Sequence, residues 1–402
     1  MMDFFTEDLW SIILARLPLK TMATSKLVCK QWKSILESPF LQEIFLSHHQ
    51  NSHPSWSLMR RDAPEKVVAH YGCEVWGLPR SLGSYYTVLA YTDIGLILLH
   101  VRTLFVDETY YVANPITKQR IKIPPPSEDL LGFAETTEEL GFVDSYFFLR
   151  QASLVAQTEN GVVLGYKVVL TGTRFRDTGC FIVFLMYSSE TGTWSYKTLQ
   201  SSLPLVSSYH CDSISLNGNL YWLGNNLVSQ DVLVSYDFYG SENQCRVIPF
   251  PDSEEEKPNF KRSCTASEGN LMYMNITSQY KDDGSLENKL RVWRLKNGSE
   301  WQLVSETSPA FIKTGTDYIP LVINPFDANT VYLWSEMDKS LVSLNLRNGN
   351  LELHNELERS SNGQTLSSFR CIKEMNTMEC LSNSYFSFVL PRWLYRIPRR
   401  QH

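Results

Sequence analysis

The sequence predicts an α+β protein with two parts: a small helical domain at the N-terminus and a larger all-β domain of the propeller type. Three observations predict this class. Between Phe5 and Phe45, apolar residues recur at the spacing of a helix face. From about Ser55 onward, short apolar or alternating runs are separated by turn dipeptides such as Asn160-Gly161, Asn217-Gly218 and Asn297-Gly298. Some of these runs recur with a period of about 50 to 60 residues, close to one kelch-type blade.

The first predicted helix begins at Thr6, which is a good N-cap residue. Glu7 and Asp8 then place negative charge in the first turn, where the helix dipole favours it. Pro18 should end the helix, because the residue before a proline disfavours the α region. One buried face is expected from the residues that recur at helical spacing: Leu9, Ile12, Ile13 and Leu17.

Further helices are predicted up to about residue 50. A second apolar stripe consists of Val28, Trp32, Ile35 and Leu36. Ser38 and Pro39 start another helix as N-cap and first helical residue. Its apolar face consists of Phe40, Leu41, Ile44 and Phe45. Apolar groups beyond one buried face are Trp10, Leu14, Leu19 and Met22. About 45 residues cannot bury all of these in a core of their own, so the following domain or a partner should cover the surplus.

The same segment resembles an F-box. The family pattern includes a helix closed by Leu-Pro, here Leu17-Pro18, and a Val-Cys-Lys-x-Trp motif, here Val28 to Trp32. The first motif departs, because Phe5-Thr6 stands where the family usually has Leu-Pro. The resemblance implies docking on a Skp-type adaptor, which joins a cullin scaffold that carries a RING ubiquitin ligase. It assigns adaptor binding to Leu9, Ile13, Leu17, Pro18, Leu19, Val28, Cys29, Lys30 and Trp32. Some of these, Trp32 especially, could instead be helical core, and a plain helical cap on the next domain is the alternative.

Composition and charge argue against several classes of protein. With 402 residues, 43% hydrophobic and 12% aromatic, the chain should be well packed and not disordered. Its net charge of -6 and the lack of a long basic block argue against nucleic acid as a partner. No apolar run is long enough to span a bilayer, so no membrane partner is expected. The N-terminus lacks the basic region of a secretory signal, which favours an intracellular protein of the nucleus, the cytoplasm or both.

Three segments are expected: an F-box over residues 1–50, a kelch-like or F-box-associated β-propeller over 51–391, and a basic C-terminal tail over 392–402. The tail is expected to be disordered because it carries Arg392, Arg396, Arg399 and Arg400. The eight cysteines are scattered without a Cys-x-x-Cys pair, so they are expected to be reduced.

Two recurring units favour a propeller. A turn followed by an aromatic-rich strand occurs at 217–222, 268–273 and 328–334. A second strand unit follows each of these, at 234–238, 291–295 and 341–346. Closed propellers repeat a four-stranded sheet around an axis and thereby hide their strand edges. Full repeats are visible three times, and the remaining length allows five to seven blades.

The start of the β-domain resembles the first blade of plant F-box proteins with kelch or F-box-associated domains. The resemblance is carried by three runs: Asp93 to Leu99, the Tyr111 to Lys118 run with Asn114-Pro115-Ile116-Thr117, and Ile121 to Pro124. Asn-Pro is also a turn signal by itself, so a simple hairpin is the alternative for the second run.

The last apolar run, Tyr385 to Leu390, is predicted to close the ring. A propeller must pair its last blade with its first, or it exposes two long strand edges. We therefore expect this run to pair with chain somewhere between about Trp56 and Leu99. Removing residues 384–402 should open the ring, whereas removing only residues 392–402 should have little effect.

No nucleotide-binding loop, Gly-x-Ser-x-Gly or His-Glu-x-x-His motif occurs, so no catalytic residue, cofactor or metal site is predicted. His48, His49 and His53 are poorly spaced as metal ligands. Three other segments each have two interpretations. Residues 188–194 fit a blade turn better than the Asp-box of sialidase propellers. The acidic run 252–256 is a solvated loop or a contact for a basic substrate. Arg174 to Arg176 form a binding loop or a solvated hairpin tip.

The resemblance to plant F-box proteins implies a non-catalytic substrate-recognition subunit of a Skp–cullin–F-box ubiquitin ligase. The F-box would bind the adaptor, the propeller would hold a protein substrate, and ubiquitination would be promoted by proximity. An F-box scaffold without ubiquitin transfer and a propeller enzyme such as a glycoside hydrolase remain alternatives. The substrate cannot be identified, because propeller loops vary freely on a common frame.

Overall fold

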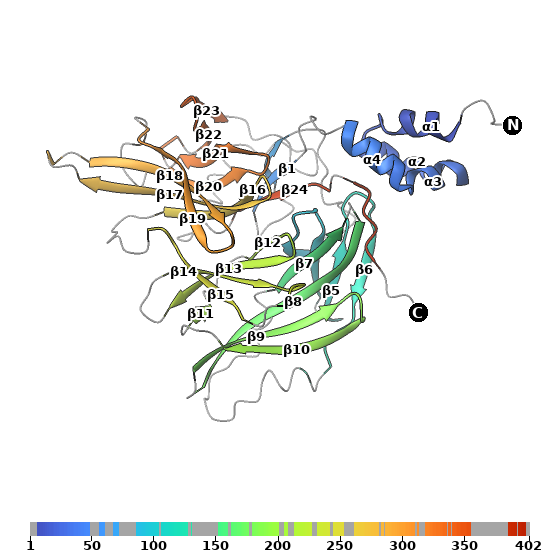
Figure 1. Cartoon of the computed structure of the whole chain (residues 1–402), viewed down its shortest axis with the longest axis horizontal. Helices are drawn as coiled ribbons and strands as arrows, with labels where there is room; N and C mark the ends of the chain where they lie inside the picture. The colour runs from blue at the N-terminus through green and yellow to red at the C-terminus, as the bar shows by residue number, and fades with distance from the viewer. Residues whose placement is uncertain are drawn as a thin grey trace.

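The computed structural model describes the helical region and most strands of the β-domain (Figure 1). The described residues are 6–48, 56–60, 67–71, 86–103, 106–127, 130, 152–159, 162–176, 179–200, 205–207, 213–226, 231–241, 244–252, 261–280, 283–284, 286–309, 312, 318–335, 337–338, 340–354, 385–391 and 393–398. His49, His53, the acidic residues 253–256, the predicted turn at Asn160-Gly161, Arg392, Arg399 and Arg400 lie outside them.

Four short helices make up the N-terminal domain: α1 (Glu7–Leu14), α2 (Leu19–Ser25), α3 (Lys30–Leu36) and α4 (Pro39–His48). The predicted N-caps are confirmed. The Thr6 hydroxyl accepts from the backbone N–H of Leu9 at 3.5 Å, and the Ser38 hydroxyl accepts from that of Leu41 at 3.2 Å. These bonds satisfy backbone donors that a helix start leaves without an intrahelical acceptor.

The predicted buried face of α1 is wrong. Leu9, Ile12 and Ile13 are 45%, 42% and 42% exposed, whereas Leu14 and Ala15 are fully buried. Ser11 is buried beside them, and its hydroxyl donates to the carbonyl of Glu7 at 2.9 Å. Small side chains on this inner face let neighbouring helices approach closely, so the face with the larger number of branched residues is left outside. Met22, which was counted among the surplus, is also fully buried in this core.

The β-domain consists of six antiparallel sheets in the described part of the chain. Blade 1 contains β3 (Tyr86–Tyr91), β4 (Ile97–Thr103), β5 (Val106–Ala113) and β6 (Arg120–Ile123). Blade 2 contains β7 (Ala152–Glu159), β8 (Val162–Arg176), β9 (Gly179–Ser188) and β10 (Thr193–Gln200). Blade 3 contains β11 (Leu205–Ser207), β12 (Ile214–Leu216), β13 (Asn219–Asn226), β14 (Asp231–Asp237) and β15 (Arg246–Pro249).

Blade 4 contains β16 (Lys261–Ser267), β17 (Asn270–Tyr280), β18 (Leu286–Lys296) and β19 (Glu300–Thr307). Blade 5 contains β20 (Tyr318–Asn324), β21 (Asp327–Ser335), β22 (Ser340–Asn345) and β23 (Leu351–His354). Blade 6 contains β1 (Trp56–Arg60), β2 (Val67–Tyr71) and β24 (Tyr385–Val389). Edge strands of neighbouring sheets lie side by side, with β3 and β12 beside β7, and β20 beside both β16 and β24. This arrangement is the predicted propeller, and its six sheets fall within the predicted range of five to seven blades.

The two ends of the β-domain close the ring, as predicted. β24 pairs antiparallel with β1, so that Trp56 lies opposite Val389 and Arg60 opposite Tyr385. Phe388 then packs against blade 1, with its ring centroid 6.2 Å from that of Tyr91. Blade 6 is therefore built from the beginning and the end of the domain, which removes the open edges that an unclosed ring would leave.

The predicted turn dipeptides have the backbone that a tight hairpin needs. Asn217 and Gly218 have φ of 49° and 79°, and Asn297 and Gly298 have φ of 50° and 70°. Two successive residues with positive φ are typical of the type I′ turn, which matches the twist of a hairpin. Asn tolerates this conformation better than most residues, which is why the Asn-Gly pair predicted these turns correctly.

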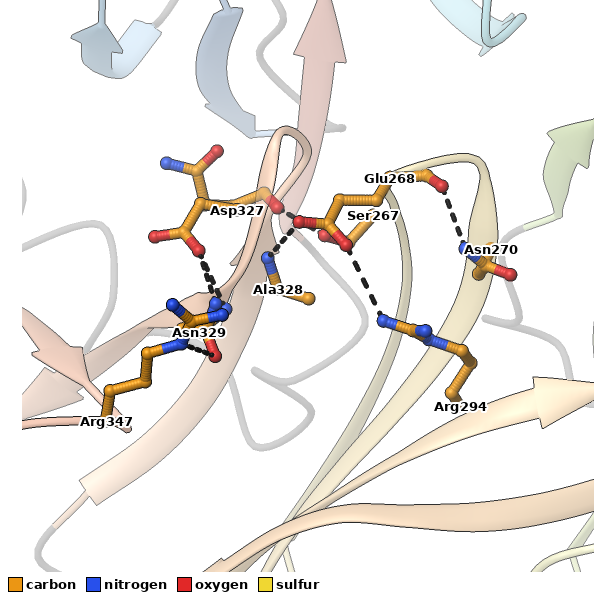
Figure 2. A network of polar contacts seen from close by, with 9 residues as sticks. Ser267, Glu268, Asn270, Arg294, Asp327, Ala328, Asn329 and Arg347 are labelled. Atoms are coloured by element: carbon orange, nitrogen blue, oxygen red, sulfur yellow. Dashed lines mark hydrogen bonds and ion pairs between the residues drawn. The ribbon is translucent and has the colours of Figure 1, made fainter.

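The corresponding turn of blade 4 uses Glu268, which has φ of 48°, and it is held by contacts to blade 5 (Figure 2). The Glu268 carboxylate accepts from the backbone N–H of Ala328 at 3.3 Å and pairs with Arg294 at 3.5 Å. The neighbouring Ser267 hydroxyl donates to the carbonyl of Asn324 at 2.6 Å. The contacts to Ala328 and Asn324 join blades 4 and 5, whereas the pair with Arg294 lies within blade 4. Together they stabilise an unfavourable backbone conformation.

The predicted disorder of residues 392–402 is wrong for the described residues 393–398. Trp393, Leu394 and Ile397 are all buried. Arginines dominate the composition of this segment, but its apolar residues decide its conformation because they have a surface to pack against. No helix in the described residues is long and apolar enough to cross a membrane.

Candidate adaptor interface

The helical domain exposes an unusual amount of apolar surface. Of the thirteen large hydrophobic residues that are exposed in the described part of the chain, six lie between Thr6 and His48: Leu9, Ile12, Ile13, Leu27, Val28 and Phe40. The remaining seven are distributed over the strands and turns of the β-domain. Exposed apolar groups that concentrate in one small domain indicate a surface that another molecule covers.

Helix α1 provides three of these residues. Leu9, Ile12 and Ile13 stand at positions i, i+3 and i+4, which places them on one face of the helix. The opposite face carries Leu14 and packs into the helical core. The helix is therefore apolar on two sides, one that folds the domain and one that is left free.

The connection between α2 and α3 provides the most exposed apolar residues of the domain. Leu27 is 87% exposed and Val28 is 62% exposed. Backbone bonds from Leu27 N–H to the carbonyl of Thr24 and from Val28 N–H to that of Ser25, at 3.0 and 3.1 Å, fix this connection. Both side chains are thus presented to solvent by an ordered backbone.

The nine residues assigned to adaptor binding divide into two groups in the structure. Those with exposed side chains are Leu9, Ile13, Pro18, Val28 and Lys30. Those that are half-buried are Leu17, Leu19, Cys29 and Trp32. An adaptor could contact the first group without any change in the helical domain.

The half-buried group supports the shape of the domain. Leu17, Leu19 and Trp32 pack against the helical core, and the Trp32 ring lies 5.2 Å from that of Trp10. The Cys29 thiol caps α3, because its Sγ accepts from the backbone N–H of Trp32 at 3.4 Å. The alternative interpretation of Trp32 as helical core is therefore partly right.

The sequence interpretation left out three exposed residues of this surface: Ile12, Leu27 and Phe40. Ile12 and Phe40 were assigned to buried helix faces, and Leu27 was not assigned to adaptor binding although it directly precedes Val28. A signal was present, because Leu27 lies between two helices and outside both apolar stripes.

The other segments considered for function have structural positions. Residues 188–194 form the turn between β9 and β10, and Trp194 donates its ring N–H to the carbonyl of Pro124 at 2.7 Å. Arg174 to Arg176 belong to the end of β8, paired with Gly179 to Phe181 of β9. Among the described residues, no group of His, Cys, Asp and Glu could hold a metal ion.

Asp252 corrects the interpretation of the acidic run as solvated, because its side chain is only 4% exposed. Its carboxylate accepts from the hydroxyl of Tyr273 and from the amide of Asn275, each at 2.5 Å. Burial and the nearby carboxylate raise the pKa of Tyr273 well above its ordinary value. This cluster ties the end of blade 3 to β17 of blade 4.

Two known protein families match this chain, one over the helical domain and one over the β-domain. The F-box domain family matches residues 5–42, which cover α1 to α3 and the start of α4. The family described as F-box protein At3g26010-like, beta-propeller matches residues 54–399, which cover all strands from β1 to β24 and the C-terminal segment.

Several proteins are similar to this chain over nearly its whole length. The chain is 46% identical to F-box protein At3g28330 of Arabidopsis thaliana, over 99% of this chain and 96% of that protein. It is 33% identical to F-box protein At3g26010 of the same organism, over 98% of this chain and 90% of that protein. It is also 34% identical to the Arabidopsis thaliana protein named putative F-box/kelch-repeat protein At4g22430, over 98% of this chain and 92% of that protein.

Proposed function

Because this chain belongs to the family of F-box proteins with an At3g26010-like β-propeller, we propose that it is the substrate-recognition subunit of a Skp–cullin–F-box ubiquitin ligase. The observation that carries the proposal is the exposed apolar surface of the helical domain, at the residues of the F-box motif. A Skp-type adaptor would cover this surface, and a cullin with its RING subunit would follow through the adaptor.

The proposed mechanism is proximity without covalent chemistry in this chain. The helical domain would fix the chain to the adaptor, and the propeller would hold a protein substrate near the charged ubiquitin-conjugating enzyme. Holding two reactants together raises the effective concentration of a substrate lysine at the thioester. The chain itself would supply no catalytic residue and no cofactor, and it would act in the nucleus, the cytoplasm or both.

Val28→Asp tests the adaptor interface. Val28 is 62% exposed, so a carboxylate there stays hydrated in the free chain and should leave folding unchanged. Docking would bury that carboxylate without giving it a positively charged or hydrogen-bonding partner. This costs several kcal/mol, which lowers the affinity for the adaptor about a hundredfold or more. We expect co-purification of a Skp-type adaptor to be lost.

Met337→Asp is the matched control, because Met337 is a 70% exposed apolar residue of blade 5. We expect it to capture the adaptor as the unaltered chain does. Undiminished capture by Val28→Asp, with the same melting temperature as the control, would contradict the proposed interface.

A second candidate function is an F-box scaffold that does not support ubiquitin transfer. One observation favours it: Thr6, which stands where the family has a proline, is used to cap α1. Co-purification of a cullin together with the adaptor separates the two functions, because a scaffold outside the ligase would not retain the cullin.

A further inference from the structure

The C-terminal segment completes the core of the helical domain. Outside the helical domain, the described residues of this core come from only two places: Ile116 of blade 1 and the run Trp393 to Tyr395. Trp393 packs on Phe45 of α4, with ring centroids 5.3 Å apart. We call residues 393–398 the C-terminal strap.

The strap is also bound to blade 1, on the turn between β5 and β6. The Asn114 side-chain amide donates to the carbonyl of Tyr395 at 2.8 Å. Gln119 makes two bonds to Ile397, donating to its carbonyl at 3.1 Å and accepting from its N–H at 2.9 Å. Ile397 is buried in the hydrophobic core shared by blades 1 and 2.

Asn114 has two roles in this turn, and they use different atoms. Its Oδ1 accepts from the backbone N–H groups of Ile116 and Thr117, at 2.9 and 3.2 Å, and so shapes the turn. Its Nδ2 is left for the strap. Ile116 then reaches the helical core, so this Asn-Pro turn is the place where helices, strap and propeller meet.

The chain just before the strap lies against the Asp93 to Leu99 run. Gly95 has φ of 79°, and a Cβ at this position would lie 2.5 Å from Cδ of Pro391 and 2.7 Å from the carbonyl oxygen of Val389. Only glycine allows this close approach in this conformation. The chain therefore leaves β24 along the first turn of blade 1 and continues toward the helices.

An ion pair adds a contact on the helical side. Arg396 of the strap pairs with Glu37 at the end of α3. Glu37 also lies 3.9 Å from Lys26, and burial lowers the pKa of that lysine. The strap thus contacts α3 by charge, α4 by packing and blade 1 by hydrogen bonds.

We propose that the C-terminal strap fixes the F-box helices in one orientation on blade 1, so that helices and propeller move as one body. Trp393, Asn114 and Gln119 are then positioning residues for the complex. Under the proposed function, on which this consequence rests, the strap holds the bound substrate at a defined distance from the adaptor.

Distance distributions between two spin labels test the strap. Labels are introduced as unnatural amino acids at Ser34 of α3 and Met337 of blade 5, both exposed, in the full chain without a partner. We expect one narrow distribution for the unaltered chain. We expect a broad distribution for Asn114→Asp combined with Trp393→Ala. The aspartate keeps the Oδ1 acceptor that shapes the turn, but it replaces the Nδ2 donor to the Tyr395 carbonyl with a second oxygen that repels this carbonyl. The alanine removes the packing on Phe45.

Asn345→Asp is the matched control. Asn345 shapes the equivalent turn of blade 5, where its Oδ1 accepts from the N–H groups of Arg347 and Asn348, away from the strap. Its distribution should stay narrow. If the double variant melts at a lower temperature than the control, the distance distribution of the single variant Gln119→Glu tests the proposal instead. This substitution removes only the side-chain donor to the carbonyl of Ile397.

A narrow distribution in the strap variants, or a broad one in the unaltered chain, would overturn the proposal. Capture of a Skp-type adaptor is measured on the same samples and should persist in the strap variants. If the strap variants lose the narrow distribution but still capture the adaptor, the strap is supported independently of ligase function. If no sample captures the adaptor, the proposed function is contradicted, but the distance result remains valid.

Discussion

Two adjacent residues of α1 have opposite roles. Ile13 is 42% exposed and is free for a partner, whereas Leu14 is fully buried in the helical core. The helical spacing of apolar residues predicted the helix correctly, but it could not assign the faces, because α1 is apolar on both. The deciding feature was the pair of small residues, Ser11 and Ala15, on the inner face.

This difference gives a prediction for aspartate at each position. Ile13→Asp should leave the helical domain folded and abolish adaptor capture, because its charge is desolvated only on docking. Leu14→Asp should unfold the domain itself, since a buried unpaired charge costs on the order of 3 kcal/mol or more. The helix content of both variants is measured by circular dichroism, and their adaptor binding is measured by a pull-down. Equal helix content in the two variants would contradict the assignment of faces.

Glu268 gives a second prediction at the residue scale. Its φ of 48° costs a non-glycine residue about 1 kcal/mol or more, and its contacts to Ala328 and Arg294 offset that cost. Ala and Gly substitutions both remove the contacts, but only Gly also removes the strain. We expect Glu268→Gly to be about 1 kcal/mol more stable than Glu268→Ala in denaturant unfolding. Equal stability would show that the turn relaxes without its contacts.

At the scale of elements, the sequence predicted what local chemistry determines. Asn-Gly dipeptides predicted tight turns, and the alternation in Tyr385 to Leu390 predicted a closing strand that does pair with β1. The strap could not be predicted, because its arginines suggested a solvated tail and its apolar residues follow no period. Its conformation depends on Ile116 and Gln119, which lie more than 270 residues earlier in the chain.

Two truncations separate the closing strand from the strap. Removing residues 384–402 deletes β24, so β1 loses one of its two partners and the ring opens. We expect insoluble or easily proteolysed protein. Removing only residues 392–402 keeps β24, so the ring should stay closed and the protein soluble. The deletion also removes the buried side chains of Trp393, Leu394 and Ile397, so we expect a lower melting temperature and a helical domain that is more sensitive to protease, and not the small effect expected from the sequence. A protease-resistant product in the first case would contradict ring closure by β24.

At the scale of the whole molecule, the helical domain lies at one side of the six-bladed propeller and shares its core with the strap and with one turn of blade 1 (Figure 1). Six exposed apolar residues remain on the helices after this packing. The surplus of apolar groups over what a small domain can bury is therefore covered only in part by the following domain. We assign the rest to a partner.

Hydrogen exchange with and without a Skp-type adaptor tests this central claim most directly, because it reports where along the chain a partner binds. The account predicts slower exchange in α1, in the α2–α3 connection and at the start of α4, with no change in the strands from β1 to β24. Slower exchange in the strands without any change in the helices would contradict it.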